Sequence, residues 1–116
     1  MTVDAKLKSI LETFGDPVEA GTYTGQATRY YTFNYSTLPS DFADDTPQHE
    51  RYHVQVHLFA PLDENINAQV RKTKAALAAG GFQWPSVTNA SDESRRHIVF
   101  ETEISEGVEL DGDNGN

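Results

Sequence analysis

The stretch at residues 51–60, RYHVQVHLFA, alternates two kinds of side chain along its length. The even-numbered positions carry Tyr52, Val54, Val56 and Leu58, which are apolar. The odd-numbered positions carry His53, Gln55, His57 and Phe59, which are mostly polar. Because successive side chains of a strand point to opposite faces of a sheet, this pattern predicts a half-buried β-strand. Residues 29–36, RYYTFNYS, alternate in the same way and predict a second strand.

The segment between these strands, residues 37–49, contains two prolines and three aspartates. This composition is too interrupted for a helix or a strand and predicts a long loop between the two strands. Loops of this length in small domains are commonly functional.

Apolar residues recur at helical spacing in residues 2–14 and again in residues 64–79. Thr2 and Asp63 are suitable N-caps, and glycines just after each stretch mark the helix ends. The two apolar stripes consist of Val3, Leu7, Ile10, Leu11 and Phe14 in the first helix and Ile66, Val70, Thr73 and Leu77 in the second.

Four further segments complete the expected domain. Residues 18–23 predict a weak strand, and residues 82–84 an extended segment that Pro85 marks as an edge or bent strand. Residues 87–94 predict a polar turn, and residues 96–104 alternate as a final strand.

The order helix, three strands, helix, two strands predicts a single α+β domain over residues 1–105. We expect an antiparallel sheet of mixed strand order, packed on one face by both helices. The expected core combines Tyr31, Phe33, Val54, Val56, Ile98 and Phe100 of the sheet with Leu7, Ile10, Ile66, Val70 and Leu77 of the helices. The opposite face keeps His53, Gln55, His57 and His97 and is a candidate surface for another subunit.

Charge and composition exclude several classes of function. The chain has 116 residues, no cysteine and a net charge of -9, which removes disulfides, thiol chemistry and a basic nucleic-acid face. Neither an apolar run of about 20 residues nor a signal peptide is present, so a soluble intracellular protein without membrane partners is expected. Residues 101–116 hold six acidic residues and no basic one, and residues 106–116 predict a disordered acidic tail.

No metal or cofactor site is expected. His49, His53 and His57 are spaced by four, but on a strand such neighbours stand roughly 13 Å apart, too far to share an ion. His97 on another strand could approach one of them. Asp41, Asp44 and Asp45 lack the glycine turn and distal glutamate of a calcium loop.

The sequence also contains no recognisable catalytic motif. Gly80-Gly81 follows a helix and so is a C-cap, since a phosphate-binding loop precedes one. Glu101 and Glu103 are expected to be solvated, which does not suit general acid–base catalysis. We therefore expect a protein that is not an enzyme.

Five stretches carry a family resemblance: YYTFNY at 30–35, FADD at 42–45, ERYHVQVHLFAP at 50–61, AAGGF at 78–82 and RHIVFE at 96–101. With the order of elements, they resemble the small tail-terminator, or tail-to-head joining, proteins of long-tailed bacteriophages and prophages. The resemblance covers about residues 1–105, and its motifs are structural rather than catalytic.

This resemblance implies a hexameric ring that caps the tail tube and joins it to the head connector, in the virion tail and, during assembly, in the host cytoplasm. Its implied partners are other copies of the chain, the major tail tube protein and head–tail connector proteins, with no sequence-specific nucleic acid and no cofactor. Residues 40–48 would reach a neighbour or the tube, and the expected contact residues are Asp41, Phe42, Asp44, Asp45, Arg51, His53 and His57.

Three alternatives stay open. One is another neck or head-completion adaptor. The second is a small ligand-binding or enzymatic α+β domain with its site on the face of His53, His57 and His97. The third is an interaction module that uses the acidic tail.

Overall fold

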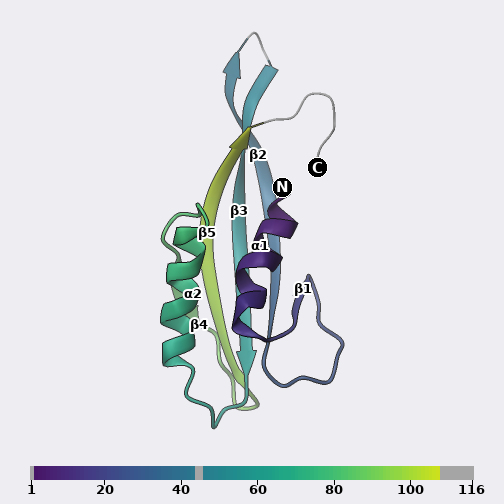
Figure 1. Ribbon diagram of the computed structural model, residues 1–116, viewed down its shortest axis with the longest axis vertical. Coiled ribbons are helices and arrows are strands. Elements are labelled where there is room, and N and C mark those ends of the chain that lie inside the picture. Colours follow the sequence, from purple (N-terminus) through teal and green to yellow (C-terminus); the bar gives the residue numbers. More distant parts are fainter. Residues whose placement is uncertain (1, 44–45, 108–116) are drawn as a thin grey trace.

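β3 (Thr46–Ala60) is the central strand of a five-stranded sheet in the computed structural model (Figure 1), which describes the backbone of residues 2–43 and 46–107 and the side chains of 2–37 and 50–105. The strand order is β1-β2-β3-β5-β4. The other strands are β1 (Val18–Ala20), β2 (Tyr30–Ala43), β4 (Ser86–Asn89) and β5 (Arg96–Gly107). The predicted α+β class is confirmed.

β1 departs from the expected antiparallel arrangement. It pairs with β2 in parallel, whereas the β2–β3, β3–β5 and β4–β5 pairs are antiparallel. Residues 21–29 carry the chain from the end of β1 back to the level where β1 began, so β2 starts in the same direction. The sheet is therefore mixed.

Both helices lie on one face of the sheet, as predicted (Figure 1). α1 (Val3–Leu11) is followed by a single 3₁₀ turn, and Thr2 caps it by accepting the Ala5 N–H at 3.1 Å. Gly15, at φ 87°, ends the 3₁₀ turn in the left-handed conformation that favours glycine. None of the described helices is long and apolar enough to cross a membrane.

α2 (Asn67–Ala79) begins three residues later than the pattern predicted, so Asp63 is not its N-cap. The preceding residue, Ile66, is buried in the core at 5% exposure and holds a non-helical conformation. Asn65 instead accepts the Asn67 N–H at 3.0 Å. Burial of Ile66 thus sets the start of the helix.

The core lies between the helices and the sheet, and its predicted members are confirmed. Ile10 and Val70 are partly buried against it, and the rest of the predicted set is buried: Tyr31, Phe33, Val54, Val56, Ile98, Phe100, Leu7, Ile66 and Leu77. Alternation along β2, β3 and β5 explains this agreement, because one face of each of these strands is mainly apolar.

The predicted long loop at residues 37–49 is wrong. β2 and β3 stay paired from Tyr30↔Phe59 to Ala43↔Thr46 in one unbroken register. We call residues 38–43 and 46–51 the hairpin arm. Its tip extends past Gly107, where β5 ends, and stands at one end of the long axis (Figure 1).

Proline fits inside this arm because of its place in the ladder. The Tyr31 N–H donates to the Pro17 carbonyl and the Phe33 carbonyl accepts the Gly21 N–H, so odd-numbered residues of β2 direct their backbone groups away from β3. Pro39 is also odd-numbered and lies in the same register, so its backbone groups also point away from β3. Its missing N–H therefore removes no bond to β3.

The strand expected at residues 82–84 is also wrong: β4 lies at Ser86–Asn89 and overlaps the start of the predicted polar turn at residues 87–94. Phe82 is buried at 4% exposure and closes the core after α2, with its N–H donating to the Leu77 carbonyl at 3.1 Å. The Gln83 N–H donates to the Glu103 carbonyl of β5 at 2.9 Å, and regular pairing with β5 begins after Pro85, at Ser86.

One buried hydrogen-bond chain joins the sheet to α2. The Thr73 hydroxyl donates to the Gln69 carbonyl at 2.7 Å, so the Tyr31 hydroxyl, 2.7 Å away, donates to Thr73. Tyr31 in turn accepts from the Gln69 side chain at 3.0 Å. Tyr31 and Thr73 are both fully buried.

We expect Tyr31→Phe to lower the free energy of unfolding by about 1–3 kcal/mol, because it removes two hydrogen bonds of the core, one to the Thr73 hydroxyl and one from the Gln69 side chain. Urea denaturation measures the change. The control is Tyr35→Phe, which removes a bond to Asp4 at a surface where Tyr35 is 38% exposed and should cost less than about 1 kcal/mol. Equal losses for the two variants would contradict the role of the buried chain.

Candidate functional site

The face of the sheet that the helices leave uncovered, here called the open face, carries the predicted residues Arg51, His53 and His57. All three have odd numbers on β3, whereas the buried Val54 and Val56 have even ones. The open face therefore gathers these three side chains as the sequence predicted.

Near the hairpin arm the open face is charged. His53 lies 3.6 Å from a Glu101 carboxylate oxygen and 3.4 Å from one of Glu103, and Arg51 lies 4.0 Å from Glu103. These side chains are a third to a half exposed, and exposed ion pairs contribute little to stability. This part of the face offers charge and hydrogen bonds to a partner.

The centre of the open face holds two histidines in direct contact. Nδ1 of His57 lies 2.8 Å from Nε2 of His97, which confirms the expected approach of His97 to one of the β3 histidines. A hydrogen bond between two imidazoles uses one proton, so one of the two facing nitrogens must be unprotonated. Among the described residues, no group of three His, Cys, Asp or Glu side chains could hold a metal ion.

Both histidines are shifted toward the neutral form. Burial lowers the pKa of His57, and the neighbouring His97 lowers it further. Burial also lowers the pKa of His97, with Arg95 acting in the same direction and Asp92 in the opposite one. Both shifts disfavour protonation of the pair relative to free imidazoles.

At the end of the sheet opposite the arm, four aromatic rings cross the strands in a row. Successive ring centroids lie 4.4 Å apart for Tyr23–Tyr30, 4.9 Å for Tyr30–Phe59 and 4.2 Å for Phe59–His97. The register creates the row, because Phe59 pairs directly with Tyr30 on one side and with His97 on the other. We call these four side chains the aromatic row.

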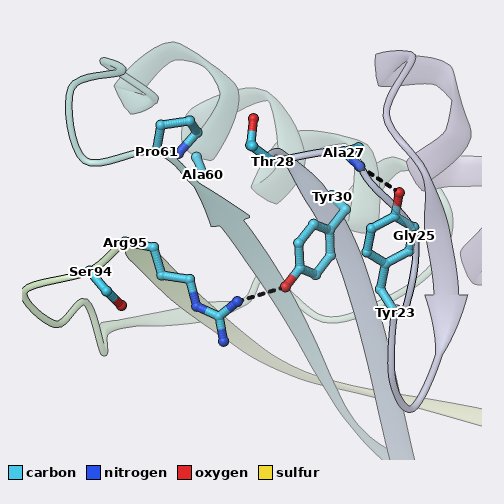
Figure 2. A pocket seen from close by; sticks show the side chains of 9 residues that line it. All are labelled: Tyr23, Gly25, Ala27, Thr28, Tyr30, Ala60, Pro61, Ser94 and Arg95. Carbon is cyan, nitrogen blue, oxygen red and sulfur yellow. Dashed lines mark hydrogen bonds between the residues drawn. The ribbon is translucent and has the colours of Figure 1, made fainter.

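Arg95 is fixed against the aromatic row. Its guanidinium carbon lies 4.4 Å from the Phe59 ring centroid, and Nη1 donates to the Tyr30 hydroxyl at 2.9 Å (Figure 2). Stacking on an aromatic ring together with a hydrogen bond restricts a side chain that is otherwise flexible.

A pocket of about 420 Å³ opens beside Arg95. Figure 2 shows its walls, which come from the loop before β2, the end of β3 and the turn before β5. The lining residues are Tyr23, Gly25, Ala27, Thr28, Tyr30, Ala60, Pro61, Ser94 and Arg95. The pocket thus joins three segments that are distant in sequence.

The loop wall is shaped around the Tyr23 ring. The Tyr23 hydroxyl accepts the Ala27 N–H at 2.9 Å, and a Cβ on Gly25 would collide with the Tyr23 ring. Glycine at position 25 therefore lets the loop close over Tyr23.

Sequence reasoning missed the pocket and Arg95. Tyr23 fell in a predicted weak strand, Tyr30 in a predicted strand and Arg95 between the predicted turn and the final strand, and nothing in their spacing relates them. The available signal in the sequence was that each of these aromatic or cationic residues lies near the end of a strand. That signal indicates a shared site only when the strand register is known.

The remaining predicted contact residues belong to the hairpin arm. Asp41 and Phe42 lie in β2, where the structure describes the backbone alone. Asp44 and Asp45 lie outside the described residues. Their proposed contacts stay predictions.

No family model and no curated protein sequence matches the chain. One solved structure aligns with 93% of this chain and 94% of its own, with a TM-score of 0.61 and 11% sequence identity. Similarity at that identity shows the fold alone.

Stability should fall as the pH is lowered through the range in which histidine titrates. The pKa values of His57 and His97 in the folded state lie below the ordinary 6.5, so the unfolded chain binds more protons near pH 6. The stability of the neutral pair is complete above pH 6.5 and is lost as the pH falls through the lowered values.

Urea denaturation between pH 7.5 and pH 5 tests this, with His57→Gln expected to reduce the loss of stability at low pH. His53→Gln is the matched control, because it changes a histidine of the same strand and leaves the ring-to-ring bond intact. An unchanged pH dependence in His57→Gln would refute the link to the pair.

Proposed function

We propose that this protein is a structural, non-enzymatic subunit of a phage or prophage tail, specifically a tail terminator that forms a homo-oligomeric ring, most simply a hexamer. The ring would cap the tail tube and join it to the head connector. The resemblance in the sequence suggests this role. The structural observation that supports it is the free edge of β2 together with the hairpin arm.

Most of β2 lacks a neighbour on its outer side. β1 pairs only with Tyr31, Thr32 and Phe33, and no other described strand pairs with β2 on that side. Because odd-numbered residues of β2 direct their backbone groups away from β3, the N–H and C=O groups of Tyr35 and Thr37 point outward. An edge of this kind is a template for pairing with another chain.

The arm adds a second reason to expect a partner. Two strands that extend past the rest of a sheet are marginally stable in water, because they lack a hydrophobic face to bury. The arm contributes to a molecule that measures 54 × 25 × 22 Å, and its tip stands beyond β5. An arm of this length suits contact with a neighbouring copy or with the tube.

Charge is compatible with a ring through which DNA passes. The chain carries a net charge of -9, and like charges repel phosphate, so the lumen would not retain DNA.

The central test is assembly. We expect light scattering after size exclusion to give the mass of a closed ring, and electron microscopy of mixtures with the major tail tube protein to show capped tubes of limited length. A strict monomer at high concentration that leaves tube length unregulated would overturn the proposal.

Thr37→Pro tests the free edge directly. It removes an outward N–H and no bond to β3, so the monomer should fold normally while the ring is lost. Thr37→Val keeps the N–H and is the matched control. Circular dichroism checks folding and light scattering the mass, and an intact ring in Thr37→Pro would show that this edge is not the interface.

A further inference from the structure

Arg95 has binding capacity that its own fold does not use. One of its N–H groups donates to the Tyr30 hydroxyl, and no carboxylate of the described residues lies within salt-bridge distance of its guanidinium. The arginines nearby are engaged: Arg29 binds Asp16 at 3.0 Å and Glu64 at 2.9 Å, and Arg96 donates to the Glu64 carbonyl at 2.7 Å.

The pocket beside Arg95 suits a particular chemistry. Its walls include the rings of Tyr23 and Tyr30 and the apolar Ala60 and Pro61, with one guanidinium held at the rim. A guanidinium presents several N–H groups in a planar fork that matches a carboxylate. Because the side chain is already fixed, binding such a group would order little more of it. The pocket thus fits a carboxylate that stands next to an apolar side chain.

The hairpin arm carries this combination. Residues 38–45 read LPSDFADD, in which Asp41, Asp44 and Asp45 surround Phe42. Asp41 and Phe42 belong to β2 in the arm, and Asp44 and Asp45 follow them in the sequence.

The arm cannot reach the pocket of its own molecule. Tyr30 lines the pocket at one end of β2, and Ala43 of the arm lies at the other end. Thirteen steps along the strand separate Tyr30 from Ala43, which is roughly 43 Å. Figure 1 shows the arm and the start of β2 at opposite ends of the sheet. The occupant must come from another molecule.

We propose that the pocket beside Arg95 receives the acidic hairpin arm of a second copy of this chain, with an arm carboxylate on the guanidinium and Phe42 against the aromatic wall. This inference rests on the proposed ring function and names the partner surface of its arm. The contact joins two different surfaces of identical molecules, and contacts of this kind form a ring when the rotation between successive copies closes.

Charge reversal tests the pairing. Arg95→Glu, and separately the triple change Asp41→Lys, Asp44→Lys and Asp45→Lys, should each raise the concentration of half-maximal assembly by about tenfold or more. The variant that combines all four changes should assemble better than either parent, because the two reversed charges again attract. Analytical ultracentrifugation over a concentration series measures all of these.

Three controls keep the result specific. Arg71→Glu alters an exposed arginine of α2 by the same charge and should assemble as wild type. Arg95→Gln removes the charge without adding a negative one and should weaken assembly if Arg95→Glu does. Thermal unfolding confirms that each variant is folded.

The outcomes separate this inference from the proposed function. A wild-type monomer overturns the ring itself. A ring that Thr37→Pro abolishes and Arg95→Glu leaves intact overturns the pocket contact alone. A third outcome concerns the acidic tail. If removal of residues 108–116 weakens assembly as much as Arg95→Glu does, while reversal of the arm charges leaves assembly unchanged, the pocket binds the acidic tail and the arm contact is refuted.

Discussion

The unbroken pairing of β2 with β3 is the constraint on which the rest of the structure depends. One register, from Tyr30↔Phe59 to Ala43↔Thr46, determines which side chains enter the core and which remain on the open face. A shift of a single residue would exchange these two sets, because side chains alternate along a strand. The same register stacks the aromatic row at one end and projects the arm at the other.

The parts of the fold that depend on periodicity could be predicted from the sequence. The class, the sheet face that is buried and the cap at Thr2 follow from alternation, helical spacing and local hydrogen bonding. Proline and aspartate misled the prediction for residues 37–49, because composition does not reveal which backbone groups of a strand face outward. Knowledge of the parity of β2 makes Pro39 compatible with a strand.

The candidate site was less accessible to sequence reasoning. The histidine contact could be anticipated in outline, since His57 and His97 shared a predicted face on separate strands. The site around Arg95 could not, because it combines a loop, a strand end and a turn through long-range pairing. Tertiary contacts between separate segments, rather than local preferences, create this chemistry.

Pro39 also limits how far a sheet can grow. A strand added along β2 would find donors at Tyr35 and Thr37 and then meet a position without an N–H. Exposed edges that offer an uninterrupted row of donors invite open-ended stacking into fibrils. The row of donors along this edge is interrupted at Pro39. A strand that pairs along this edge thus meets a gap in the row of donors, which disfavours amyloid-like stacking.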